Sequence, residues 1–233
     1  MAVRPIFIPN DTIKYKEINI EFKWHGGFAV SQKKKNIIEL HNQAKLKGYN
    51  NILEVSSKSD LELGKKLSAF NLKIDTPKGK ISIESAFQGS KVFENYIQFE
   101  DIYLKNSLEA KKDIRLKNSG KIIEFNFFGD IWENEPKTAF YDWLYISALY
   151  PYKDYLYRNL LKFDGFSDIE FNPKKSINCQ ARSCAILSSL LKENLLDKAM
   201  INKENFIKIV YNKNNYRKRE YFQRVPKQKS LFI

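Results

Sequence analysis

Residues 84–91 read Glu84-Ser85-Ala86-Phe87-Gln88-Gly89-Ser90-Lys91. In an α-helix, which turns by about 100° per residue, four of these side chains share one stripe: Glu84, Phe87, Gln88 and Lys91. A carboxyl group and an amine held beside an aromatic ring can form an acid–base or nucleophilic site. On spacing alone, however, the simpler interpretation is an amphipathic helix whose solvated face carries one acid and one base.

The length and composition predict a folded protein without a membrane segment. A chain of 233 residues fits one large domain or two small ones, and its 43% of hydrophobic residues can supply a core. No stretch approaches the roughly 18 apolar residues of a membrane helix, and the first residues do not begin an apolar signal sequence. We therefore expect a cytoplasmic protein with no membrane partner.

Cysteine and histidine are too few to suggest a disulfide framework or a metal site. Cys179 and Cys184 stand five residues apart on a predicted helix, a geometry unsuited to a disulfide bond. The two histidines, His25 and His41, are not accompanied by a cluster of ligands. We expect a reduced protein that needs no metal ion and no cofactor.

Positive charge is the strongest signal in the composition. The formal net charge is +13, which favours acidic partners and nucleic acid above all. Residues 213–229 hold seven basic residues and one acidic residue, interleaved with aromatic rings. Here cations could bind phosphates while rings stack on unpaired bases, and the candidate contacts are Arg217, Lys218, Arg219 and Arg224. The alternative is a basic terminus that only aids solubility.

Local patterns predict an α+β fold in which helices dominate and the N-terminal third contains strands. Runs of β-branched and aromatic residues predict strands at 6–8, 18–24, 52–55, 80–83 and 122–127. Apolar periodicity and capping signals predict helices at 32–47, 60–64, 107–119, 138–150, 153–163, 178–193 and 203–210. Ser31 is the expected N-cap of the first helix, and Ser59 with Glu62 has the spacing of a capping box. We expect one domain over residues 1–212, followed by a basic aromatic tail at 213–233.

Several segments occur in the order that is found in one protein family. They are Leu67-Ser68-Ala69-Phe70-Asn71, the E-x-x-F-Q-x-x-K pattern of 84–91, a helical stretch from Trp132-Glu133 through Leu160-Leu161, Asp168-Ile169-Glu170-Phe171, and residues 178–187. Over about residues 52–195 the chain thus resembles the NADAR (YbiA-like) family, and in particular its branch associated with DarT-type toxins. It departs from the family pattern in three places. Ala69 stands where the family usually has asparagine, Phe171 replaces a tryptophan, and residues 172–177, with two lysines, replace a glycine-rich turn. Such a turn would hold phosphates with backbone N–H groups; here Lys174, Lys175 and a helix N-terminus could do so instead.

The resemblance implies an N-glycosidase that removes ADP-ribose from guanine bases in DNA. Such an enzyme would reverse the modification made by a DarT-type toxin, as an antitoxin or a counter-defence protein, and would release ADP-ribose. Breaking the C1–N bond builds positive charge on the ribose, and Glu84 is the candidate for stabilising that charge and for proton transfer. Lys91 could attack the anomeric carbon as an amine. Alternatively, it could stay charged and hold a hydroxyl group or the diphosphate.

The same resemblance marks nine residues as candidates for binding the substrate: Ser68, Phe70, Asn71, Phe87, Gln88, Asp168, Phe171, Asn178 and Arg182. Phe70 and Phe171 could sandwich a base, although aromatic rings more often belong to a core. Gln88 suits ribose hydroxyls, Asp168 suits the ribose or a water, and Arg182 suits a bidentate contact with the diphosphate. The simpler alternatives are a surface amide for Gln88 and a surface salt bridge for Arg182. Asp168 and Asn178 could instead cap a turn or a helix.

Two other functions stay open on the sequence. The same glycosidase chemistry could act on a small ribosylated metabolite of the riboflavin-pathway type, although the net charge and the basic tail count against it. Alternatively, the chain could bind nucleic acid without catalysis, and here the intact pair of Glu84 and Lys91 counts against it.

Overall fold

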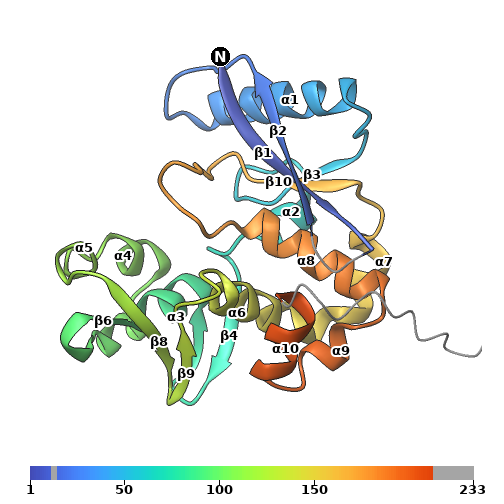
Figure 1. Ribbon diagram of the computed structural model, residues 1–233. Coiled ribbons are helices and arrows are strands. Elements are labelled where there is room, and N and C mark those ends of the chain that lie inside the picture. The colour runs from blue at the N-terminus through green and yellow to red at the C-terminus, as the bar shows by residue number, and fades with distance from the viewer. Residues whose placement is uncertain (12–14, 212–233) are drawn as a thin grey trace, which may run out of the picture.

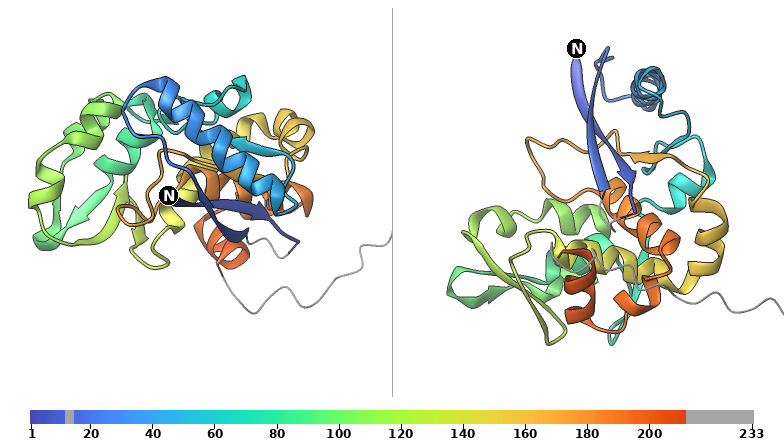
Figure 2. Two further views of the ribbon diagram at one scale, coloured as in Figure 1. Left: turned by 90° about the horizontal axis from the view of Figure 1, so that it is seen from above. Right: turned by 45° about the vertical axis from the view of Figure 1, so that its right-hand side comes forward.

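The computed structural model describes residues 1–11 and 15–211 of the chain (Figure 1). Within this part, small sheets lie around a buried group of helices, as the further views also show (Figure 2). The tail predicted at 213–233, with Arg217, Lys218, Arg219 and Arg224, lies outside the described residues. Its separation from a single domain over 1–212 therefore stays a prediction.

The first sheet joins the N-terminal strands to a strand far along the chain. In the order β2-β1-β10-β3, it consists of β1 (Ala2–Pro9), β2 (Tyr15–Phe22), β3 (Ile52–Glu54) and β10 (Gly165–Ser167). β1 is antiparallel to β2 and β10, whereas β10 and β3 are parallel. Helix α1 (Val30–Leu46) lies on this sheet at the top of Figure 1, and its Leu40 belongs to a buried cluster with Ile6 and Ile20.

The second sheet, in the order β7-β6-β8-β9, is antiparallel throughout and lies at the lower left of Figure 1. Its strands are β6 (Lys91–Phe93), β7 (Ile97–Gln98), β8 (Ile122–Phe127) and β9 (Asp130–Glu133), while β4 (Lys73–Thr76) and β5 (Gly79–Ser82) form a separate hairpin. Two 3-10 turns and two short helices connect the strands: η1 (Glu94–Tyr96), η2 (Glu100–Leu104), α4 (Ser107–Lys112) and α5 (Arg115–Asn118).

The buried centre consists of α3 (Ile83–Gly89), α6 (Ala139–Leu149) and α8 (Gln180–Lys192). Every residue of α3 is buried, so this helix has no solvated face. Tyr145 connects α6 to α8 and to the segment that follows α2 (Glu62–Lys66). Its hydroxyl donates to the Leu67 carbonyl at 2.5 Å and lies 3.1 Å from Cys184 Sγ of α8. Around the centre pack α2, the 3-10 turn η3 (Tyr150–Tyr152), α7 (Lys153–Leu160), α9 (Leu196–Ala199) and α10 (Lys203–Val210).

This architecture confirms the predicted α+β class. The predicted strands correspond to β1, β2, β3, β5 and β8, and the long predicted helices to α1, α6, α7, α8 and α10, with shifted ends. Both capping predictions were wrong: Ala29 and Leu61 occupy the N-cap positions of α1 and α2, and neither provides a side-chain cap. Tertiary packing stabilises these helices without a cap.

The stretch 84–91 is not one helix. α3 ends at Gly89, and Lys91 begins β6, where it is paired with Phe125 of β8. The structure changes at Ser90, whose hydroxyl donates to the Ala86 carbonyl and whose carbonyl accepts from the Asn126 N–H, both at 2.7 Å. Pairing with β8 therefore takes hold one residue before Lys91 and prevents a further helical turn.

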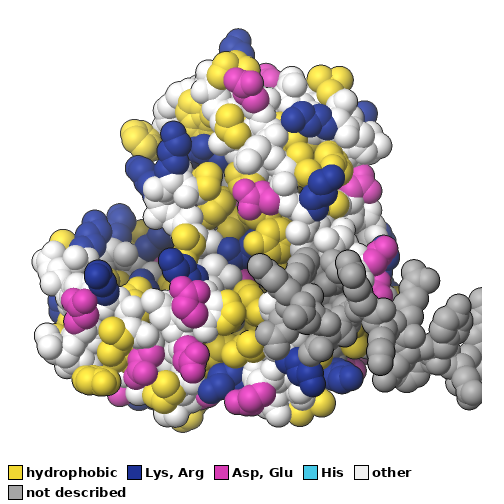
Figure 3. Space-filling view, in the orientation of Figure 1, with side chains coloured by type: hydrophobic (Ala, Val, Ile, Leu, Met, Phe, Trp, Pro, Cys, Tyr) yellow, Lys and Arg dark blue, Asp and Glu magenta, His cyan; other side chains and the backbone are white. Residues whose placement is uncertain are grey.

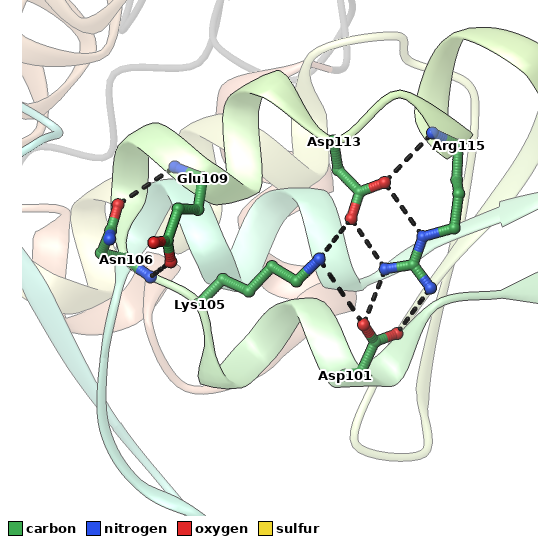
Figure 4. Close-up of polar contacts among 6 residues, drawn as sticks. All are labelled: Asp101, Lys105, Asn106, Glu109, Asp113 and Arg115. Atoms are coloured by element: carbon green, nitrogen blue, oxygen red, sulfur yellow. Dashed lines mark hydrogen bonds and ion pairs between the residues drawn. The ribbon is translucent and has the colours of Figure 1, made fainter.

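The helix predicted over 107–119 is divided by Asp113, whose side chain is 5% exposed. Its carboxylate accepts from Lys105 Nζ at 2.6 Å and from the Arg115 backbone N–H and guanidinium at 2.7 to 3.0 Å. The same guanidinium pairs with Asp101 at 2.6 Å, so it joins two carboxylates (Figure 4). The hydrogen bonds from Arg115, followed by that from Lys105, lower the pKa of Asp113. The bend between α4 and α5 is thus fixed by charged groups.

Replacing Gly89 by alanine should destabilise the protein, because α3 lies against Tyr103 at this point. A Cβ atom at Gly89 would stand 2.7 Å from Cδ1 of the Tyr103 ring, and the Tyr103 hydroxyl is tied to the Asn126 carbonyl at 2.9 Å. We expect the free energy of unfolding, measured by urea denaturation, to fall by about 1–3 kcal/mol. Gly26→Ala is the matched control, because no atom lies within 4 Å of its Cβ position, and it should be neutral or slightly stabilising. An equal loss in both variants would contradict the role of the Tyr103 contact.

Candidate active site

A cavity of about 470 Å³ lies between α3, the α4–α5 segment and the loop from β10 to α8. The space-filling view shows a hollow on the left of the molecule with Lys and Arg side chains around it (Figure 3). Eight of the predicted site residues line the cavity: Phe70, Glu84, Phe87, Gln88, Lys91, Asp168, Phe171 and Asn178. The structure thus brings both candidate catalytic residues together with six of the nine candidate binding residues.

Helix α3 places Glu84 and Gln88 in the cavity one turn apart. Ser82 caps this helix by accepting from the Ser85 N–H at 3.0 Å, and Glu84 lies in the first turn, where a negative charge suits the helix dipole. Gln88 Nε2 donates to Glu84 Oε1 at 2.7 Å, and the two residues are only 9% and 7% exposed. Gln88 Oε1 has no hydrogen-bond partner within the described part of the chain. It can therefore accept a hydrogen bond from a hydroxyl group of a ligand.

Lys91 enters the same cavity from β6. Its Nζ lies 5.0 Å from the centroid of the Phe87 ring. Burial lowers the pKa of Lys91 to about 8, although the charge of Glu84 acts in the opposite direction. A much larger fraction of the lysine is then neutral near pH 7 than for an ordinary, solvated lysine.

Phe87 belongs to the core as well as to the cavity wall. Its ring stacks on Phe140 with a centroid distance of 6.1 Å and meets the edge of the Tyr141 ring at 5.3 Å. Tyr141 is buried and also lines the cavity. These contacts make a rigid apolar floor beneath Lys91.

The two rings predicted to sandwich a base have different surroundings. Phe171 is half-buried and packs edge-on against Phe7 at 6.3 Å. Phe70 is 41% exposed, and Lys111 Nζ lies 5.0 Å from the centroid of its ring. Phe70 is therefore the more accessible of the two rings for a ligand.

Asp168 is held at the cavity by a buried network behind it. Its Oδ1 accepts from the Glu170 N–H at 3.0 Å, so the predicted turn cap is present in a residue that also lines the cavity. The buried carboxylate of Glu54 accepts from the Ser167 hydroxyl at 2.6 Å and from the Ile169 N–H at 2.9 Å. Burial and the charge of Glu54 raise the pKa of Asp168, which favours its protonated form.

Arg182 does not line the cavity. Its guanidinium pairs with Asp142 of α6, at 3.1 Å to each carboxylate oxygen, and donates to the Ile177 carbonyl at 2.6 Å. Asp142 also accepts from the hydroxyls of Ser183 and Tyr211 at 2.5 Å. Arg182 therefore forms a salt bridge, but a buried one that joins two helices rather than a surface one.

Three other predictions need a correction or a comment. Ser68 is buried and Asn71 is exposed, and neither lines the cavity. Asn178 lines it but does not cap α8, because this helix begins at Gln180 with Cys179 in the N-cap position. Within the described residues, the Oδ1 atom of Asn178 is buried without a hydrogen-bond partner, so it is a second acceptor at the cavity.

Sequence reasoning missed several residues of the lining: Lys111, Asp113, Lys117, Tyr141, Glu170 and Gln180. Lys175, one of the two lysines of the 172–177 segment, does line the cavity. Gln180 Oε1 accepts from the Ala69 N–H at 2.7 Å and so connects two segments of the family pattern. Its place two residues after Asn178 was a signal that could have identified it. Lys111 and Lys117 carried no such signal, because nothing in the sequence distinguishes them from the other lysines.

Residues 1–11 and 15–211 contain neither a candidate metal site nor a candidate membrane span. No group of three or more His, Cys, Asp or Glu residues there is placed to hold a metal ion. No helix in those ranges combines the length and the apolar character needed to cross a bilayer.

The comparisons with known proteins agree with the resemblance seen in the motifs. Among curated proteins, none is significantly similar to this chain. A family model described as the DarT1-associated NADAR antitoxin matches residues 2–220, nearly the whole chain. The match extends on both sides of the region, about 52–195, in which the motifs are recognisable. The chain therefore belongs to the family of DarT1-associated NADAR antitoxins.

Proposed function

We propose that this protein is an N-glycosidase that removes ADP-ribose from guanine bases in DNA and thereby counteracts a DarT1-type toxin. Membership of the antitoxin family supports the antagonism with the toxin. The enzymatic proposal rests above all on one observation: Glu84, Gln88 and Lys91 meet in one cavity. There a carboxylate and an amine of lowered pKa border the same space.

Glu84 has the surroundings needed to stabilise the transition state of glycosidic cleavage. As the bond between the ribose anomeric carbon and the guanine nitrogen breaks, positive charge develops on the sugar ring. A carboxylate in a buried site stabilises such charge more strongly than one in water. Gln88 donates a hydrogen bond to Oε1 of Glu84. The other carboxylate oxygen of Glu84, Oε2, can therefore face the sugar or accept a proton from the attacking water.

Lys91 acts as the nucleophile in this proposal. The neutral amine bonds to the anomeric carbon as the guanine leaves with the electron pair of the broken bond and takes up a proton. The amine nitrogen loses one proton as this bond forms, which balances the proton taken up by the guanine. The ribose ring then opens: its ring oxygen leaves C1 and takes up a proton while the nitrogen loses its second one, and an imine forms. Water then hydrolyses the imine, which frees Lys91 and releases ADP-ribose. The burial of Lys91 over the Phe87 ring supports this role, because it favours the neutral amine.

Glu84→Gln should lower the turnover of ADP-ribosylated DNA by about 10²- to 10⁴-fold. An amide at this position can still accept the hydrogen bond from Gln88, so the fold should be preserved. The measurement is the release of ADP-ribose from an oligonucleotide that carries one modified guanine. Glu62→Gln, the same change on the exposed residue at the start of α2, is the control and should keep full activity. Full activity of Glu84→Gln would remove Glu84 from the mechanism.

The pH dependence of the reaction should report the ionisation of Lys91. Because deprotonation produces the attacking amine, kcat/KM for the modified oligonucleotide should rise with pH until it levels off above about 8. Borohydride should reduce the imine and leave the opened sugar attached to Lys91, detectable by mass spectrometry of the peptide. Lys91→Arg should be inactive, because a guanidinium stays charged.

The opposite results would assign Lys91 a purely electrostatic role. In that case kcat/KM would fall above about pH 8, Lys91→Arg would keep substantial activity, and borohydride would yield no adduct. The pH profile of kcat/KM for Glu84→Gln, measured in parallel, would show whether the ionisation of Lys91 persists without the neighbouring carboxylate.

A further inference from the structure

We infer that the mouth of the cavity binds the sugar–phosphate backbone of single-stranded DNA on either side of the modified guanine. The contacts are Lys111, Lys117 and Lys175, and Phe70 is the surface on which a neighbouring base stacks. The inference rests on the proposed function and deepens it. It assigns DNA contacts to the described part of the protein, apart from those predicted in the basic tail.

Three lysines reach the cavity from three separate elements. Lys111 belongs to α4, Lys117 to α5, and Lys175 to the loop between β10 and α8. No carboxylate from the described ranges lies within ion-pairing distance of any of them, whereas Lys105 and Lys203 each have such partners. Unpaired cations around a cavity attract a polyanion, and they bind it with a strong dependence on salt.

The carboxylates near the mouth do not cancel this charge. Asp113 is already paired with Lys105 and Arg115, and Glu170 is paired with Lys33 of α1 at 3.4 Å. Both acids are thus engaged by cations that do not line the cavity. Lys111, Lys117 and Lys175 are therefore available to form ion pairs with an anionic ligand.

Phe70 offers a ring at the same mouth. It is exposed, it carries Lys111 over its face, and the backbone next to it is fixed because Ala69 donates to Gln180. An exposed aromatic ring beside cations is typical of surfaces that bind single strands, where the ring stacks on a base and the cations hold phosphates.

The depth of the catalytic pair explains why the bound strand is unpaired. Glu84 is buried and Lys91 half-buried, and both line the cavity, so a guanine stacked inside a duplex could not bring its glycosidic bond to them. Enzymes that act on bases in this way take the nucleotide out of the stack or act on single strands. The neighbouring bases then lose a stacking partner, which Phe70 can replace.

The test compares two substrates in the full-length protein. One is a single-stranded oligonucleotide with one ADP-ribosylated guanine, and the other is the ADP-ribosylated deoxyguanosine nucleoside. The triple variant Lys111→Gln/Lys117→Gln/Lys175→Gln should lose at least about tenfold in kcat/KM on the oligonucleotide. Its slope of log kcat/KM against log salt should fall by about 2, since each of three phosphate contacts contributes roughly 0.7. Turnover of the nucleoside should change little.

The matched control removes three exposed lysines outside the cavity, Lys45, Lys66 and Lys208. Lys45→Gln/Lys66→Gln/Lys208→Gln has the same net charge as the first triple variant and should keep both the activity and the salt slope. Phe70→Ala should lose roughly fivefold or more on the oligonucleotide, and Phe70→Trp should restore most of it.

Three results would overturn the inference, and each differs from a failure of the proposed function. They are an unchanged salt slope in the first triple variant, an equal loss in the two triple variants, and an equal loss on both substrates, which would place the lysines at the diphosphate. If the wild-type protein released ADP-ribose from neither substrate, the proposed function itself would fail.

Discussion

The carboxylate of Asp142 is fully buried, and the arrangement of the molecule depends on how that charge is satisfied. A buried carboxylate costs several kcal/mol unless hydrogen-bond donors surround it. Arg182 and Ser183 provide donors from α8, and Tyr211 provides one from the end of α10. The charge thus fixes α6, α8 and α10 relative to one another. Because Arg182 also donates to the Ile177 carbonyl, it positions the end of the loop that leads into α8.

A second buried carboxylate, Glu54, has the same effect at the beginning of that loop. It accepts from Ser167 and from the Ile169 N–H, on both sides of Asp168. The segment between Ile169 and Ile177, part of which lines the cavity, is therefore held at each end by a buried acid. The site itself consists of short pieces from distant parts of the chain, and their relative positions are set by these buried acids together with the hydrogen bond from the Ala69 N–H to Gln180.

The sequence predicted the long elements well, because their signals are local. Apolar periodicity located α6, α8 and α10, and β-branched runs located β1, β2 and β8. Runs of β-branched residues also located the short strands β3 and β5, whereas the short strands β6, β7 and β10 were not predicted, since they depend on pairing with other strands rather than on a local pattern. For the same reason the sequence did not predict that the helix ends before Ser90, because the hydrogen bond that the Ser90 carbonyl accepts from the Asn126 N–H depends on β8. The motif residues Glu84, Gln88 and Lys91 were nevertheless found to share a cavity. Arg182 was misplaced because nothing in the sequence showed that Asp142, forty residues earlier, would be buried beside it.

The break at Ser90 changes what the seven-residue interval between Glu84 and Lys91 means. An insertion before Gly89 would rotate Glu84 by about 100° around the axis of α3 relative to everything that follows. An insertion after Gly89 would leave α3 unchanged but would shift the register of β6 by one residue, which turns Lys91 to the other face of the sheet. The interval is thus fixed by two independent geometries that meet at one residue. Substitutions inside it can be compensated locally, whereas a change in its length cannot.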